Sequence, residues 1–186
     1  MFRPMSKQMT KHKYLLLLAL ALVAIAGCKG EKKSEEPETF QFTIYPGSRY
    51  LQQVTEAFKQ AKKASDPTGE IPPMAIYDTD APLDTVAQFY AKSYGYSSVA
   101  PDATNNLSAA KPPAYYRTGD LGADARAVEP ITKKIGLNTD VSKATGTYRA
   151  AEISRKPNRP QVTVQRPYFD VTTSQVVDRT IILMSR

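Results

Sequence analysis

Four aspartates are the side chains of this 186-residue chain whose types and spacing could support catalysis. They form two pairs along the sequence, Asp78 with Asp80 and Asp120 with Asp124. Ionised carboxylates act as covalent nucleophiles and as hard oxygen ligands for magnesium. If the four side chains converged in one cleft, they would suit a metal-dependent hydrolase.

The sequence around these pairs resembles two motifs of haloacid-dehalogenase-type phosphatases. The resemblance implies that Asp78 is the nucleophile, Asp80 the acid/base, and Asp120 and Asp124 the metal-site residues. Pro82 stands where the first motif of the family has a threonine. Only about forty residues separate the motifs, which leaves little room for the alternating parallel strands and helices of that fold.

A different explanation of the same residues requires no catalysis. Asp80 can cap the helix that follows it, and Gly119-Asp120 can form a turn. Carboxylate pairs also hydrolyse glycosidic bonds without histidine, but the chain has no tryptophan to stack against sugar rings.

Histidine and cysteine occur once each, and both lie near the N-terminus as His12 and Cys28. Residues 29–186 therefore contain no Ser-His or Cys-His nucleophilic site and no histidine ligand for zinc or iron. A disulfide cannot form within one copy of the chain.

The first 28 residues carry the most specific pattern. Basic residues lead into an unbroken apolar run over residues 15–26, and no acidic residue interrupts this region. A helix that spans a bilayer needs about 20 apolar residues, so this shorter run is typical of the apolar core of a secretory signal peptide. The segment ends in the residues Ile25-Ala26-Gly27-Cys28, which resemble the lipobox of bacterial lipoproteins.

This resemblance implies cleavage before Cys28, diacylation of its sulfur and acylation of the new amino terminus. Several acyl chains, at about 0.8 kcal/mol per buried methylene, anchor a soluble domain stably where one chain does not. We therefore expect a lipid-anchored protein of the cell envelope, with the covalent lipid at Cys28 and no other cofactor or metal. An ordinary signal peptide with a chance cysteine and an uncleaved helical anchor are the alternatives.

The sequence divides into a signal peptide over residues 1–27, a lipidated cysteine and flexible tether over residues 28–39, and one domain over residues 40–186. The tether is charged and contains proline, a composition typical of a flexible segment. Four of the 25 basic residues and none of the 18 acidic residues precede Cys28, so the remaining chain has a net charge of +3. Lys29 differs from the aspartate that holds some lipoproteins in the inner membrane, which favours the outer membrane, facing the periplasm.

Apolar periodicity predicts the elements of the domain. Strands are expected over residues 40–45, 73–80, 147–154, 161–171 and 176–184, and helices over residues 50–64, 81–94 and 121–135. Pro130 should kink or split the third helix, and Pro167 should push its strand toward an edge or a bulge. The pattern predicts an α+β fold, with an antiparallel sheet of four or five strands and two or three helices packed on one face.

The layout of the domain is similar to small bacterial envelope lipoproteins of uncharacterised function. Its features are an early Tyr-Pro-Gly turn, an acidic segment before the second helix and a closing hairpin. This resemblance implies a location and an architecture, and no activity.

Two groups of side chains offer a possible binding surface. Tyrosine and arginine are frequent in interface hot spots, whereas half-buried tyrosines at the rim of a core and a solvated sheet face are the alternative explanations. The groups are Tyr94, Tyr96, Tyr115 and Tyr116 beside Arg117, and the basic residues Arg149, Arg155, Lys156, Arg159 and Arg166 of the C-terminal strands.

The sequence thus predicts a non-enzymatic accessory or binding module, with the metal-dependent phosphatase using Asp78 and Asp80 as the alternative. Its partners are expected to be the membrane, through the lipid, and an envelope protein or cell-wall component. Nucleic acid is not expected as a partner, because a secreted, lipid-anchored chain has little access to it.

Replacing Cys28 with alanine is expected to block lipidation and cleavage, because the sulfur is the acyl acceptor of the lipobox. Intact mass should show a wild-type species that begins at Cys28 with added acyl mass, and a Cys28→Ala species that keeps the precursor mass. Membrane partitioning of both proteins is the second readout. An unprocessed or unlipidated wild-type protein would contradict the anchor.

Overall fold

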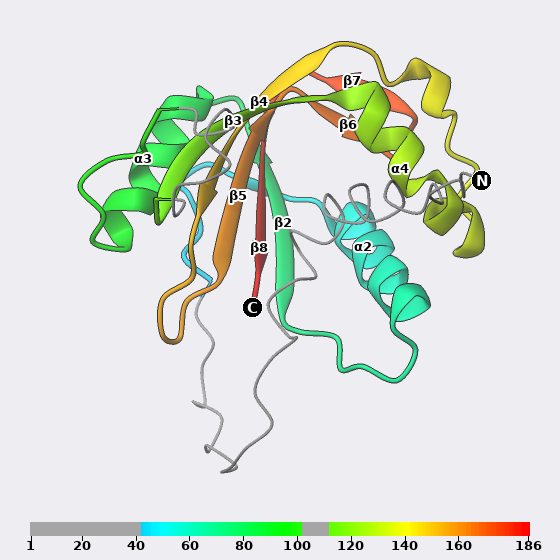
Figure 1. The fold of residues 1–186 in the computed structure, drawn as a ribbon, viewed down its shortest axis with the longest axis horizontal. Coiled ribbons are helices and arrows are strands. Elements are labelled where there is room, and N and C mark those ends of the chain that lie inside the picture. Colours follow the sequence, from blue (N-terminus) through cyan, green and yellow to red (C-terminus); the bar gives the residue numbers. More distant parts are fainter. Residues whose placement is uncertain (1–41, 102–111) are drawn as a thin grey trace, which may run out of the picture.

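The computed structural model describes residues 42–101 and 112–186. The predicted signal peptide, Cys28 and the tether lie outside the described residues. Within them, three α-helices accompany a six-stranded antiparallel sheet and a two-stranded one (Figure 1). This confirms the α+β prediction, although the main sheet has one strand more than expected. None of the described helices is both long and apolar enough for a membrane crossing.

Every pairing in the main sheet is antiparallel. Its strands follow the spatial order β1 (Arg49–Tyr50), β2 (Met74–Thr79), β8 (Thr180–Ser185), β5 (Gln161–Arg166), β4 (Thr147–Ile153) and β3 (Ala114–Asp120). The smaller sheet pairs β6 (Tyr168–Asp170) with β7 (Gln175–Val177). Strand β2 is therefore separated from β3 by three strands.

The helices cover both faces of the main sheet. They are α2 (Gln52–Ser65), α3 (Leu83–Ser93) and α4 (Leu121–Lys134), and a 3-10 turn, η1 (Val141–Lys143), follows α4. Figure 1 shows α2 and α4 on one side of the sheet and α3 on the other. Two helices on one face agree with the prediction, and the third covers the face that the prediction left open.

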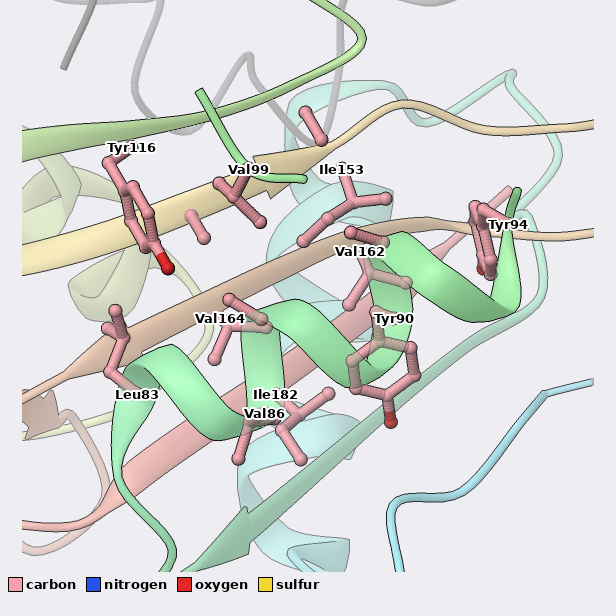
Figure 2. Packing of buried hydrophobic residues seen from close by; sticks show 14 of the residues in the cluster. Leu83, Val86, Tyr90, Tyr94, Val99, Tyr116, Ile153, Val162, Val164 and Ile182 are labelled. Carbon is pink, nitrogen blue, oxygen red and sulfur yellow. The ribbon is translucent and has the colours of Figure 1, made fainter. Parts of the chain in front are cut away.

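The face covered by α3 holds the larger hydrophobic core. Val162 and Val164 of β5 point to this face, because side chains alternate along a strand. Val164 lies opposite Ile182 of β8, and α3 covers them with Val86 and Tyr90 (Figure 2). All five side chains are fully buried, and each such burial stabilises the fold by about 1.5 to 3 kcal/mol.

The predicted first strand is wrong where the structure describes it. Residues 42–45 pair with no strand, and the Tyr45 ring instead packs edge-on against Phe89 of α3, with 5.2 Å between ring centroids. Phe42 and Tyr45 therefore contact the core without forming a ladder, whereas Ile44 is exposed. The predicted turn that follows is confirmed, and Gly47 adopts a φ of +75° there, which costs glycine little.

The C-terminal strands are shorter than predicted. Pro167 separates β5 from β6, because proline cannot donate a ladder hydrogen bond. The expected closing hairpin is formed by β6 and β7, in a sheet of its own. Helix α4 continues through Pro130 without a split, so a split at this proline is ruled out.

Candidate functional site

A cavity of about 190 Å³ lies on the face of the sheet that α2 and α4 cover. Strands β3, β4, β5 and β8 contribute its floor, and Tyr168 and Phe169 of β6 add to its lining. Figure 1 shows this side of the sheet, with β6 and β7 near α4. The cavity is thus enclosed by elements from both halves of the chain.

Most of the cavity wall is apolar. Strand β8 is hydrophobic on both faces, since Ile182 and Met184 enter the α3 core while Ile181 and Leu183 line the cavity. An uninterrupted apolar strand is the pattern of a sheet covered on both sides. The helices add Val54 and Phe58 from α2 and Leu121, Ala125 and Val128 from α4.

An ion pair lies on the floor of the cavity, among these apolar side chains. Arg117 of β3 donates from Nε to Glu152 Oε1 at 2.8 Å, and the side chains are 14% and 4% exposed. The Thr163 hydroxyl donates to the other carboxylate oxygen at 2.7 Å. A buried charge costs little only when it is paired and hydrogen-bonded, and Glu152 meets both conditions.

Tyr148 links this ion pair to α4. Its hydroxyl accepts a hydrogen bond from Arg117 Nη1 at 2.6 Å and donates one to Asp124 Oδ2 at 2.6 Å. Burial raises the pKa of Tyr148 to about 12, so the phenol is neutral at physiological pH. Burial also raises the pKa of Asp124, against the hydrogen bond from Tyr148 and the charge of Arg117.

Gly119 makes room for Tyr148. The two residues lie opposite each other on β3 and β4, and a Cβ atom at Gly119 would lie 2.3 Å from the Tyr148 ring. Any side chain at residue 119 would displace the phenol from Arg117 and Asp124. Packing therefore explains the glycine of the Gly-Asp motif.

Lys62 is the remaining charged side chain of the cavity. It belongs to α2, lines the cavity and is 7% exposed. Within the described part of the chain it forms no hydrogen bond or ion pair. Burial lowers the pKa of its ammonium group, and the nearby charge of Asp66 opposes this shift.

Asp78, the predicted nucleophile, is fully buried and saturated with donors. Arg49 donates to both carboxylate oxygens at 3.1 and 2.8 Å, and Arg179 donates to Oδ2 at 2.9 Å. The Tyr168 hydroxyl donates to the same oxygen at 3.3 Å. This carboxylate therefore connects four elements, namely β1, β2, β6 and the residue before β8. Its oxygen atoms already accept hydrogen bonds from protein donors.

Asp80 does not cap α3, so that prediction is wrong. The N-cap residue is Pro82, which makes no side-chain cap bond, and the Asp80 carboxylate pairs instead with Arg179. Asp120 is the aspartate that caps a helix, because its Oδ1 accepts from the backbone N–H of Ala123 at 2.6 Å at the start of α4.

The structure does not bring the four aspartates together. Asp78 is on β2 and Asp120 on β3, and four inter-strand spacings of about 4.8 Å separate these strands. Among residues 42–101 and 112–186, no cluster of three or more Asp, Glu, His or Cys side chains could hold a metal ion. The geometry gives the phosphatase hypothesis no support.

The predicted aromatic and basic surface is mostly buried or paired. Tyr94, Tyr115 and Tyr116 are 5% to 7% exposed, and the Arg149 guanidinium stacks 3.9 Å from the centroid of the Tyr116 ring. These tyrosines belong to the core and its rim. Arg117 faces the cavity and is itself paired with Glu152.

Three polar residues of the cavity were not predicted from the sequence, namely Lys62, Tyr148 and Glu152. The helical period could have predicted that Lys62 lies on the buried face of α2, because it follows Phe58 by four residues and Val54 by eight along the apolar stripe. Glu152 had a comparable signal as a lone acid in a strand of small and apolar residues. The partners of both residues come from other strands.

Replacing Asp78 with asparagine is expected to lower the free energy of unfolding by about 2 to 3 kcal/mol, because the buried hydrogen bonds from Arg49 and Arg179 lose their charged acceptor. Urea denaturation measures the change. Asp178→Asn is the control, since that carboxylate is 81% exposed beside Arg166 and its loss should cost less than about 1 kcal/mol. Equal losses in the two variants would contradict the structural role of Asp78.

Replacing Asp124 with asparagine is expected to change how stability depends on pH. Because the folded-state pKa of Asp124 is raised, its contribution is full below the unfolded pKa, near 3.9, and is lost as pH rises through the folded value. The variant should therefore gain stability relative to wild type between about pH 4 and pH 7.

Urea denaturation across this range measures the difference, and Asp140→Asn is the control. Hydrogen bonds from Ser142 lower the pKa of Asp140, so its stabilising contribution is gained as pH rises toward the unfolded pKa near 3.9 and is complete above it. The difference between Asp140→Asn and wild type should therefore stay flat between about pH 4 and pH 7. A difference for Asp124→Asn that is flat with pH would contradict the raised pKa.

Comparisons with protein-family models, with curated proteins and with solved structures found no match to this chain. Its function has to follow from the chemistry of its own side chains. In the cavity these are apolar walls, a hydrogen-bonded network from Arg117 to Asp124, and one buried lysine.

Proposed function

We propose that the chain is a lipid-anchored protein of the cell envelope whose folded domain is a non-enzymatic module that binds a small, largely apolar ligand. The observation that carries the binding role is the cavity between the main sheet and the helices α2 and α4. The lipobox-like residues that end at Cys28 support the anchor. The ligand is proposed to come from a cell-wall component or to be carried by an envelope protein.

The cavity has the composition of a ligand site. Such sites combine mostly apolar walls with a few placed polar groups, and here the network around Arg117 and the ammonium group of Lys62 are the polar groups. An engineered apolar cavity of about 150 Å³ in another protein takes up benzene. A cavity of about 190 Å³ therefore suits a ligand of the size of one aromatic ring or a short aliphatic chain.

The polar network favours binding over hydrolysis. Glu152 is engaged by Arg117 and Thr163, and Asp124 by Tyr148. A general base needs a free lone pair within hydrogen-bonding reach of its substrate, whereas these carboxylates are directed at protein donors. The network gives the cavity floor a fixed shape, which suits a preformed binding site.

Benzyl alcohol is a suitable neutral probe, because its ring matches the cavity and it dissolves readily in water. In the processed full chain, reconstituted in phospholipid nanodiscs, it should shift the methyl NMR signals of Ile181 and Leu183 saturably, with a dissociation constant of about 1 mM. Ala125→Leu should weaken binding at least tenfold, because Ala125 is buried and lines the cavity.

Ala123→Leu is the matched control. It adds the same atoms to the exposed side of the same helix and should leave binding unchanged. The absence of saturable shifts in the wild-type chain, or equal weakening in the two variants, would overturn the cavity as the binding site.

A further inference from the structure

Lys62 faces the cavity from a position at which the helix otherwise presents apolar side chains. Val54, Phe58 and Lys62 follow one another at intervals of four residues along α2, and all three line the cavity. Residues at this spacing share one face of a helix. Lys62 thus lies on the cavity side of α2, while the neighbouring Lys63 is exposed to solvent.

The other charges of the cavity have partners, but Lys62 has none among the residues that the structure describes. Arg117 pairs with Glu152, and Asp124 accepts from Tyr148. Lys62 is 93% buried and forms no hydrogen bond or ion pair with any residue that the structure describes.

Asp66, which attracts Lys62 electrostatically, is engaged in its own turn. Its Oδ1 accepts from the Gly69 N–H at 2.9 Å and from the Thr68 hydroxyl at 3.3 Å. Burial partly desolvates the ammonium group, although its nitrogen is not among the fully buried atoms that lack a hydrogen bond. An anion that enters the cavity can therefore reach the group and pair with it.

We propose that Lys62 is the recognition residue of the cavity and that the ligand is a small amphiphile with one carboxylate group. The apolar body of the ligand fills the space between the sheet and the two helices, and its carboxylate pairs with the Lys62 ammonium group. This inference rests on the proposed binding function and adds to it the chemical class of the ligand.

The donors that remain favour a carboxylate over a phosphate. Arg117 directs Nε to Glu152 and Nη1 to Tyr148, so its charge is already paired with a carboxylate. Lys62 is then the one cation that is left in the cavity lining, and one ammonium group balances one negative charge. A phosphate dianion would bring a second charge and further acceptor oxygens into an apolar space, at a large desolvation cost.

Benzoate and benzyl alcohol form a probe pair that isolates the carboxylate, because they share a ring and differ mainly in charge. In the processed full chain in nanodiscs, benzoate should bind at least tenfold more tightly than benzyl alcohol, as measured by the methyl shifts of Ile181 and Leu183. Lys62→Met should abolish this preference without loss of fold, because methionine keeps the apolar stem of the lysine. Lys63→Met, on the exposed side of the same helix, should retain the preference.

A second measurement uses the wild-type chain alone. Benzoate should shift the ¹³Cε signal of Lys62 and raise its titration midpoint, because the ion pair favours the charged ammonium form. Benzyl alcohol should leave this midpoint unchanged. The result therefore does not depend on how well any variant folds.

The outcomes separate this inference from the proposed function. If both probes bind the cavity with equal affinity, or if Lys62→Met keeps the preference for benzoate, the carboxylate inference is overturned and the cavity remains a binding site. If neither probe binds the wild-type chain, both the inference and the proposed binding function are overturned.

Discussion

The ion pair between Arg117 and Glu152 determines what the second face of the main sheet can be. On the α3 face, valine, isoleucine and tyrosine side chains interdigitate and exclude other groups. On the opposite face, the centre of β3, β4 and β5 carries two charges that must keep their hydrogen bonds. Tyr148 carries this network across to Asp124 of α4. The helices therefore meet this face through a polar network and a cavity, where the α3 face has a close-packed core.

A second ionic cluster, around Asp78, connects the elements at the other side of the same space. The carboxylate binds Arg49 of β1 and Arg179 beside β8, and it accepts from Tyr168 at the start of β6. Tyr168 also lines the cavity. Asp78, which the motif predicted to be a nucleophile, thus positions one part of the cavity lining. Its role is structural, because it fixes the relative positions of strands that are distant in sequence.

Local periodicity was sufficient to predict α2, β2, α3, α4 and β4, because each has a clear apolar stripe or alternation. All of them except β4 also end within two residues of a glycine or aspartate. Periodicity was insufficient to predict β3, because only its first three residues, from Ala114, are apolar and a polar run follows them. Strand β3 forms because it pairs with β4, which is a tertiary effect. The same limit applies to the site. Lys62 was not predicted, since the cavity that it lines also includes Ile181 and Leu183 of β8, which are distant in sequence. Asp80 looked like a cap, since its partner Arg179 lies 99 residues away.

The proposed role of Lys62 links recognition to stability. In the ligand-free domain the ammonium group of Lys62 is partly desolvated, and an apolar residue in its place would be expected to strengthen the fold, as replacement of desolvated charges often does. A ligand that supplies the counter-ion binds the folded state alone and therefore stabilises it by mass action. On this view the domain accepts a cost at one position of α2 in exchange for selectivity, because an entirely apolar cavity would not distinguish a carboxylate-bearing amphiphile from a neutral molecule of the same shape.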